Sequence, residues 1–124
     1  MKFVIFSPSL RISAIGWCSA SVTAELIRTG HEVRVVGTEE APPAGEPLHD
    51  FGHEVLSWRD GREVRQAVDT ADGIFYQIGN NFEFHAGALA WLPEQSAKVI
   101  LHDIYLGHQF WRRSERRRDT ATAW

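Results

Sequence analysis

Residues 2–37 decide the fold, and they read KFVIFSPSLRISAIGWCSASVTAELIRTGHEVRVVG. The stretch opens with a short run of strand-forming residues, Lys2–Phe6, which Ser7-Pro8-Ser9 ends with turn chemistry. A helix follows, because three apolar residues recur on one of its faces, and Gly30 stops it. Those three residues are Val22, Leu26 and Ile27. Glu32–Gly37 gives a second strand, and a strand, helix and strand of these lengths form a parallel βαβ unit.

The same alternation continues along the rest of the chain. A segment rich in proline and charge, 39–47, predicts a surface loop after the second strand. The further predicted strands lie at 54–58, 74–78 and 99–101. The further predicted helices lie at 60–70, with Asp60 as its N-cap, at 84–92 and at 103–113. Right-handed crossovers arrange such strands as one sheet between helices. The sequence therefore predicts an α/β fold, a Rossmann-like three-layer sandwich with a mainly parallel five-stranded sheet.

Length and composition bound the class of protein. With 124 residues, 44% of them hydrophobic, the chain can bury the core of one domain, and global disorder is not expected. The single Cys18 fits a reducing compartment, and nothing before Ser7-Pro8 resembles a signal peptide. No apolar run approaches the roughly 18 residues of a membrane-spanning helix. We therefore expect a cytoplasmic protein.

The net charge of −3 is unevenly distributed. Residues 1–111 carry 8 basic and 14 acidic side chains, whereas 112–124 carry 5 arginines and 2 acidic residues. We therefore divide the chain into a Rossmann-like lobe at 2–111 and a basic tail at 112–124. The acidic lobe disfavours nucleic-acid binding, which needs clustered Lys and Arg. We interpret Arg112–Arg118 as a solvated helix end, with weak contact to anionic lipid headgroups at the inner membrane face as the alternative.

Candidate site residues follow the carboxyl ends of the strands, where ligands bind in open parallel sheets. The loop before the first helix holds Ser13 and Gly16, which form neither the G-x-G-x-x-G fingerprint nor a P-loop. A nicotinamide or ATP site is therefore disfavoured. The amino terminus of this helix could meet a phosphate or a sugar hydroxyl, and the alternative is that Gly16 only permits a tight turn.

Two further groups of polar residues follow later strands. The carboxamides of Gly79-Asn80-Asn81 suit a neutral polyhydroxy ligand, and an Asx-turn that caps the next helix is an equally good interpretation. His85 lies near the first turn of that helix and could point into the crevice, although a helix-surface histidine is commoner. In His102-Asp103, the aspartate could cap a helix and leave His102 at the sheet edge as a hydrogen-bond donor or proton acceptor. The alternative is a histidine that merely fills space.

A metal site is not expected. Of the six histidines, only His49 and His53 share an i,i+4 spacing, and they have no cysteine partner.

Taken in order, these residues resemble the amino-terminal lobe of the retaining GT-B glycosyltransferases. The resemblance extends over about residues 2–111. Its segments are Ser13–Ser19, Arg28–Val36 with a Gly-His-Glu-Val element, Tyr76–Asn81 followed by His85, and Val99–Asp103 followed by Leu106-Gly-His108.

The resemblance implies transfer of a sugar from a nucleotide-diphosphate sugar, with retention of anomeric configuration and without a metal or other cofactor. In that family the amino-terminal lobe binds the acceptor, here a sugar or glycolipid. The resemblance makes His102 the catalytic candidate, in contact with the donor sugar near the reacting centre. It places Gly16 beside the donor phosphate and the acceptor. The substrate-binding candidates are Ser13, Gly16, Gly79, Asn80, Asn81, His85 and Asp103.

The family has a second, carboxyl-terminal lobe that supplies most contacts to the nucleotide sugar, and its motifs are not found here. We therefore expect an incomplete enzyme, a truncated or separately encoded half that needs a nucleotide-sugar-binding lobe as its partner. The alternative is a non-catalytic Rossmann-like module that binds a small polar ligand or self-associates through an uncovered sheet edge. A nucleotidyl or nicotinamide enzyme is a more distant alternative.

Overall fold

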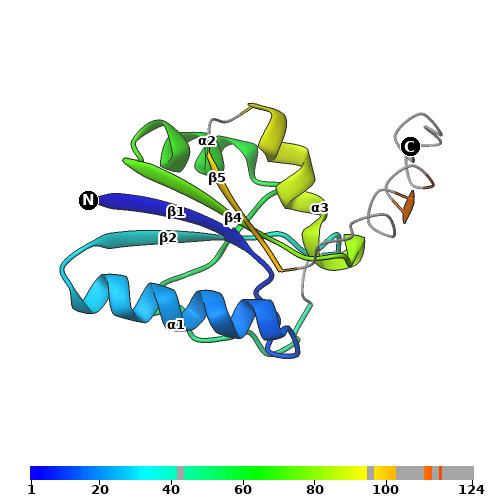
Figure 1. Ribbon diagram of the computed structural model, residues 1–124, viewed down its shortest axis with the longest axis horizontal. Coiled ribbons are helices and arrows are strands. Elements are labelled where there is room, and N and C mark those ends of the chain that lie inside the picture. The colour runs from blue at the N-terminus through cyan, green and yellow to red at the C-terminus, as the bar shows by residue number, and fades with distance from the viewer. Residues whose placement is uncertain (42–43, 95–96, 103–110, 113–114, 116–124) are drawn as a thin grey trace.

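A computed structural model describes residues 1–41, 44–94, 97–102, 111, 112 and 115. Within these residues five parallel strands form one sheet in the order β3-β2-β1-β4-β5, and helices cover both of its faces (Figure 1). The elements are β1 (Lys2–Ser7), α1 (Ala14–Arg28), β2 (Glu32–Gly37), β3 (Leu56–Ser57), α2 (Gly61–Asp69), β4 (Gly73–Ile78), α3 (Phe82–Trp91), a 3₁₀ turn (Leu92–Glu94) and β5 (Lys98–Leu101). The predicted α/β, Rossmann-like fold is confirmed.

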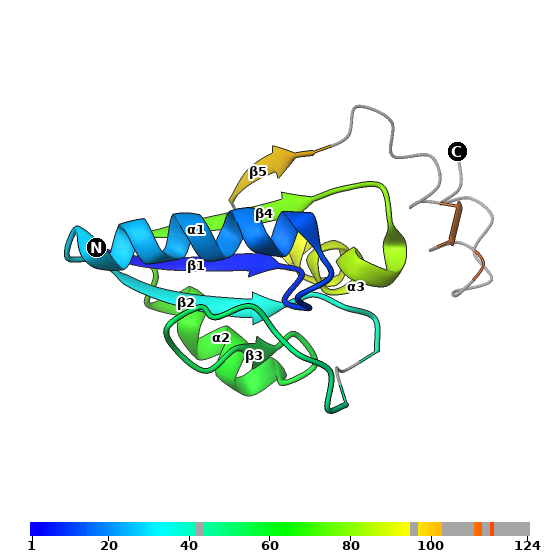
Figure 2. The ribbon, with the colours of Figure 1, turned by 90° about the horizontal axis from the view of Figure 1, so that it is seen from below.

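The hydrophobic core is divided between the two faces of the sheet, as the alternation of side chains along a strand requires. α2 and α3 cover one face and α1 covers the other (Figures 1 and 2). The first core contains Val4, Phe6, Val36, Tyr76 and Ile78 from the sheet, Val64 and Val68 from α2, and Ala88 and Trp91 from α3. The second contains Ile5, Val33, Val35 and Phe51, with Ala20, Leu26 and Ile27 of α1 packed against it.

The predicted apolar face of α1 is partly wrong, because Val22 is 46% exposed. The residues of α1 that face the sheet directly are small ones: Gly16, Ser19 and Thr23 are buried. The hydroxyls of Ser7 and Ser19 are hydrogen-bonded at 2.7 Å between their oxygens, and this contact holds the helix close to β1. Small side chains permit this close approach, and it rotates Val22 toward solvent.

β3 is shorter than the predicted strand 54–58. Only Leu56 and Ser57 pair with β2, opposite Val36 and Gly37. The segment before β3 packs on the α1 face, where Phe51 is 3% exposed. Pairing with β2 therefore begins only at Leu56. Within the described residues, an irregular segment thus connects β2 to β3, where parallel strands are usually joined by a helix.

Other boundaries need smaller corrections. Asp60 precedes α2 as predicted, but its side chain makes no capping hydrogen bond to any described residue. α3 begins at Phe82 rather than Phe84, since Asn81 caps it. The predicted helix 103–113 and the basic tail 112–124 lie outside the described residues, apart from Trp111, Arg112 and Glu115.

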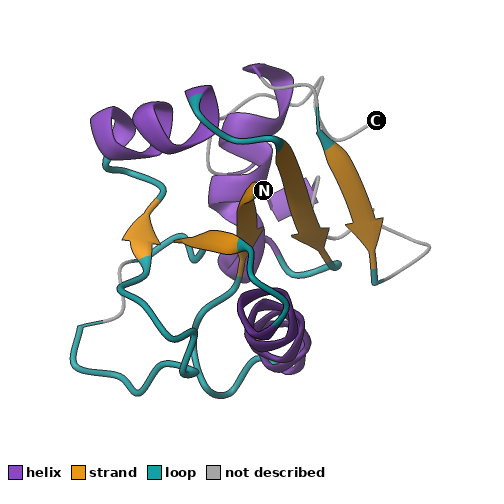
Figure 3. Ribbon diagram, turned by 90° about the vertical axis from the view of Figure 1, so that its left-hand side faces the viewer, coloured by secondary structure: helices purple, strands orange, loops and turns teal. Residues whose placement is uncertain are grey.

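β5 lies at the edge of the sheet beyond β4 (Figure 3). Its apolar side chains are exposed on both faces: Val99 by 40%, Ile100 by 42% and Leu101 by 56%. By contrast, β1 at the centre of the sheet is buried from Val4 to Ser7. No helix in the described part of the chain is both long and apolar enough to cross a membrane.

Candidate functional site

The loops at the carboxyl end of the sheet are bound to one another by hydrogen bonds. Thr38 follows β2, and its amide donates to the Ser7 carbonyl at 3.1 Å while its hydroxyl donates to the Phe84 carbonyl at 2.6 Å. The Thr38 carbonyl accepts from the Gly87 amide at 2.9 Å. β1, β2 and α3 are therefore joined at Thr38 by backbone and side-chain hydrogen bonds.

Glu39 closes one part of this edge, which we call the closed corner (Ser9, Leu10, Ser13, Gly16, Glu39 and His49). It was predicted to lie in a surface loop, and this is wrong, since Glu39 is only 5% exposed. Its Oε2 accepts from the amides of Ser9 at 2.6 Å and Leu10 at 3.0 Å, and its Oε1 accepts from Ser9 Oγ at 2.9 Å. These donors explain why a carboxylate can be buried in a charge-rich loop. In such folds the backbone amides after the first strand can bind an anionic ligand. Here the Glu39 carboxylate of the chain itself accepts hydrogen bonds from these amides.

Ser13 and Gly16 are also engaged within the closed corner. Ser13 caps α1, because its Oγ accepts from the Gly16 amide at 3.0 Å, and its carbonyl accepts from His49 Nε2 at 2.9 Å. A Cβ on Gly16 would lie 2.7 Å from the Pro8 carbonyl oxygen and 2.9 Å from His49 Cδ2. The space at Gly16 is thus filled by the protein's own backbone and imidazole, which supports the structural alternative for this glycine.

His85 was expected near the surface of its helix or at the crevice, but the structure buries it, with 1% exposed. Its Nε2 accepts from the Gly79 amide at 3.0 Å. The turn after β4 is therefore tied to α3 by an imidazole, which gives Gly79 and His85 a clear structural role.

The two asparagines of this turn lie side by side in the chain but differ in exposure. Asn81 is exposed, and its Oδ1 accepts from the Glu83 amide at 3.1 Å as the cap of α3. Asn80 is half-buried between Gly79 and Asn81. The Asx-turn interpretation thus describes Asn81.

His102 lies at the end of β5, in what we call the open corner (Gln77 and His102). It is exposed, and its amide donates to the Ile78 carbonyl at 2.8 Å, which continues the β4–β5 ladder. Its Nε2 lies 2.6 Å from Oε1 of Gln77, a β4 residue that is 4% exposed. Asp103, the other half of the predicted pair, lies outside the described residues.

A pocket of about 230 Å³ lies at the carboxyl end of the sheet, between the loop after β2 and the start of α3. Its lining consists of Leu10, Glu39, Glu40, Ala41, Glu46, Glu83 and Phe84. Arg112 pairs with Glu83 at 3.3 Å. Even with the Arg112 guanidinium beside Glu83, the carboxylates of this lining leave it net negative, which disfavours a phosphate.

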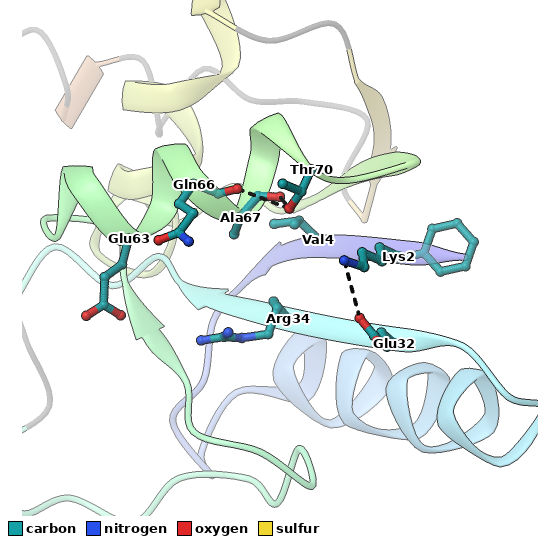
Figure 4. Close-up of a pocket in the computed structure, with 9 residues that line it drawn as sticks. Lys2, Val4, Glu32, Arg34, Glu63, Gln66, Ala67 and Thr70 are labelled. Atoms are coloured by element: carbon teal, nitrogen blue, oxygen red, sulfur yellow. Dashed lines mark hydrogen bonds and ion pairs between the residues drawn. The ribbon is translucent and has the colours of Figure 1, made fainter.

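A second pocket, of about 400 Å³, lies toward the start of the strands, between α2 and the sheet (Figure 4). Charges of both signs line it: Lys2 and Arg34 come from the sheet, and Glu63 comes from α2. Lys2 also forms an ion pair with Glu32 at 4.0 Å. This pocket contains none of the predicted site residues.

Metal ligands are not gathered anywhere in the described ranges, where no group of three or more His, Cys, Asp or Glu could hold an ion. His49 belongs to the i,i+4 pair with His53, and its Nε2 donates a hydrogen bond to the Ser13 carbonyl.

Two residues of this edge were not predicted from the sequence. Glu39 stood in a loop whose composition signals exposure, so no local pattern could have identified its burial. Gln77 is a polar residue in an otherwise apolar run of β4, and this exception to the pattern was the available signal.

No protein-family model, curated protein or solved structure matches this chain.

Proposed function

We propose that this chain is the amino-terminal, acceptor-binding lobe of a retaining GT-B glycosyltransferase. In this proposal it presents a sugar or glycolipid acceptor to a nucleotide-diphosphate sugar held by a second lobe. The observation that supports it most is the exposed His102 at the carboxyl end of β5, hydrogen-bonded to Gln77. This is the place that the resemblance gives to the histidine near the reacting centre.

The charge of the carboxyl edge favours the acceptor over the donor phosphates. Glu39 already occupies the amides of Ser9 and Leu10, and further carboxylates line the adjacent pocket. Carboxylates accept hydrogen bonds from sugar hydroxyls but repel a diphosphate. Stabilisation of the departing phosphate is therefore the task of the second lobe, by preorganised cationic groups and helix dipoles.

Ligand titrations of the isotope-labelled chain test this assignment. We expect a methyl glycoside or disaccharide to shift the amide signals of Gly79, Asn80 and His102, and a nucleoside diphosphate to leave them unchanged. Lys2 and Arg34, in the pocket at the other end of the sheet, serve as internal controls. Binding of the nucleotide alone at the carboxyl edge would contradict an acceptor lobe.

An activity assay tests the requirement for a second lobe. The purified 124-residue chain should transfer no sugar from any nucleotide-diphosphate donor, because the proposed donor platform is on the other lobe. Robust transfer by this chain alone would overturn that part of the proposal.

A second candidate is a non-catalytic assembly module that pairs with a second copy of itself. The exposed apolar residues of the β5 edge favour it, since a strand edge can pair with its own copy in the antiparallel sense. Light scattering distinguishes the candidates. A dimer that becomes a monomer in Ile100→Lys supports assembly, and a wild-type monomer excludes it.

A further inference from the structure

The hydrogen bond between Gln77 and His102 determines which imidazole nitrogen carries the proton in the neutral ring. The side-chain oxygen of an amide can only accept a hydrogen bond, so a ring nitrogen 2.6 Å from Gln77 Oε1 must be the donor. In the neutral ring the proton then lies on Nε2, and Nδ1 keeps its lone pair.

The sheet itself produces this contact. Gln77 is paired in register with Ile100, and His102 is two residues further along β5, so both side chains leave the sheet on the same face. They are diagonal neighbours across the ladder, a separation that long side chains can span. Gln77 is 4% exposed, so its carboxamide has little freedom to turn away.

We propose that Gln77 is a positioning residue, which fixes the His102 ring with Nε2 as donor and presents Nδ1 as an acceptor to a substrate hydroxyl. The part about the substrate rests on the function proposed above, whereas the state of the ring does not. Among the described residues no hydrogen bond occupies His102 Nδ1. A neutral acceptor at this position fits the hydroxyl of a sugar and offers no proton to a phosphate oxygen.

His85 provides an internal comparison on the same sheet edge. Its Nε2 accepts from the Gly79 amide, so its neutral ring carries the proton on Nδ1. The two histidines are therefore held in opposite tautomers, His102 by an acceptor and His85 by a donor.

Nitrogen-15 spectra of the imidazole rings test the proposal on the 124-residue chain, with no sugar present. The His102 signals are assigned by their loss in His102→Asn. We expect the wild-type neutral ring to carry its proton on Nε2, and this proton to exchange with water roughly fivefold faster in Gln77→Met, which keeps the size but removes the acceptor. Gln77→Glu retains an acceptor and should restore the slow exchange. The His85 signals should be the same in all variants.

A wild-type His102 with its proton on Nδ1 would overturn the proposal even if Gln77→Met failed to fold. Equal Nε2 proton exchange in the wild type and in a folded Gln77→Met variant would overturn it too. Because no substrate is used, a failure here is separate from a failure of the glycosyltransferase proposal, which the ligand titrations and the transfer assay decide.

Discussion

The closed corner and the open corner lie on the same edge of the sheet, yet they use their polar groups in opposite ways. In the closed corner, Glu39, Ser13 and His49 hydrogen-bond to other groups of the chain. In the open corner, Gln77 is buried behind a histidine that faces solvent. The comparison shows that position at the carboxyl ends of parallel strands is not enough to define a site. The edge must also leave a polar atom unused by the fold.

The largest expected effect concerns the carboxylate of the closed corner. Glu39→Ala leaves the buried amides of Ser9 and Leu10 without an acceptor, and should lower the free energy of unfolding by about 3 kcal/mol. Urea unfolding followed by tryptophan fluorescence measures it. The matched control is Glu46→Ala, an exposed residue from the same loop, which should change stability by less than about 0.5 kcal/mol. If the two variants lowered the free energy of unfolding equally, the hydrogen bonds of Glu39 would not stabilise the closed corner.

The next effect concerns the close packing at Gly16. Gly16→Ala places a methyl group against the Pro8 carbonyl and the His49 ring, and should cost about 2 kcal/mol in the same unfolding assay. Gly61→Ala is the control, because a Cβ there has no atom within 4 Å and alanine favours the first turn of α2. A Gly16→Ala variant as stable as the wild type would mean that there is room for a ligand at this position.

A smaller effect is expected at the cap of α1. Ser13→Ala removes the acceptor for the Gly16 amide and should cost about 1 kcal/mol. Ser21→Ala removes an exposed hydroxyl from the same helix and should cost less than about 0.5 kcal/mol. If Ser13→Ala were neutral for stability but weakened saccharide binding, the Ser13 hydroxyl would be a ligand-binding group rather than a helix cap.

The smallest effect on stability is expected at His102 itself. His102→Ala should change the free energy of unfolding by about 0.5 kcal/mol, because the ring is exposed and water can reach the Gln77 oxygen in its place. The same variant should abolish the saccharide-induced shifts at Gly79 and Asn80. If His102→Ala lowered the free energy of unfolding by about 2 kcal/mol or more, the role of His102 would be structural, like that of His85.

The fold was predictable from the sequence because it depends on local patterns. The strand and helix order follows from apolar periodicity and glycine or proline stops, which residues 2–37 already contain. The short β3 was not predictable, since Phe51 packs under α1 for reasons that lie in the tertiary structure. In the same way, no local signal distinguishes the buried Glu39 from its exposed neighbours.

The candidate site was predictable in position but not in the state of its residues. Strand ends placed Ser13, Gly79 and His102 on one edge, as parallel topology requires. Ser13 is hydrogen-bonded to His49, which is distant in the sequence. Gly79 is hydrogen-bonded to His85, which becomes buried only through tertiary packing. Neither role could therefore be predicted from a local pattern. The contact of Gln77 with His102 depends on the register of β4 and β5, which sequence periodicity does not set.

The exposure of β5 has a consequence for the fraction of time in which the open corner is formed. A strand that buries little apolar surface opens at a lower free energy than the strands at the centre of the sheet. The amides of Val99–Leu101 should therefore exchange with solvent before those of β1, and His102 at the end of β5 will detach together with them. Any molecule that covers β5 should raise the free energy of this opening and so increase the fraction of time for which the imidazole is held in place.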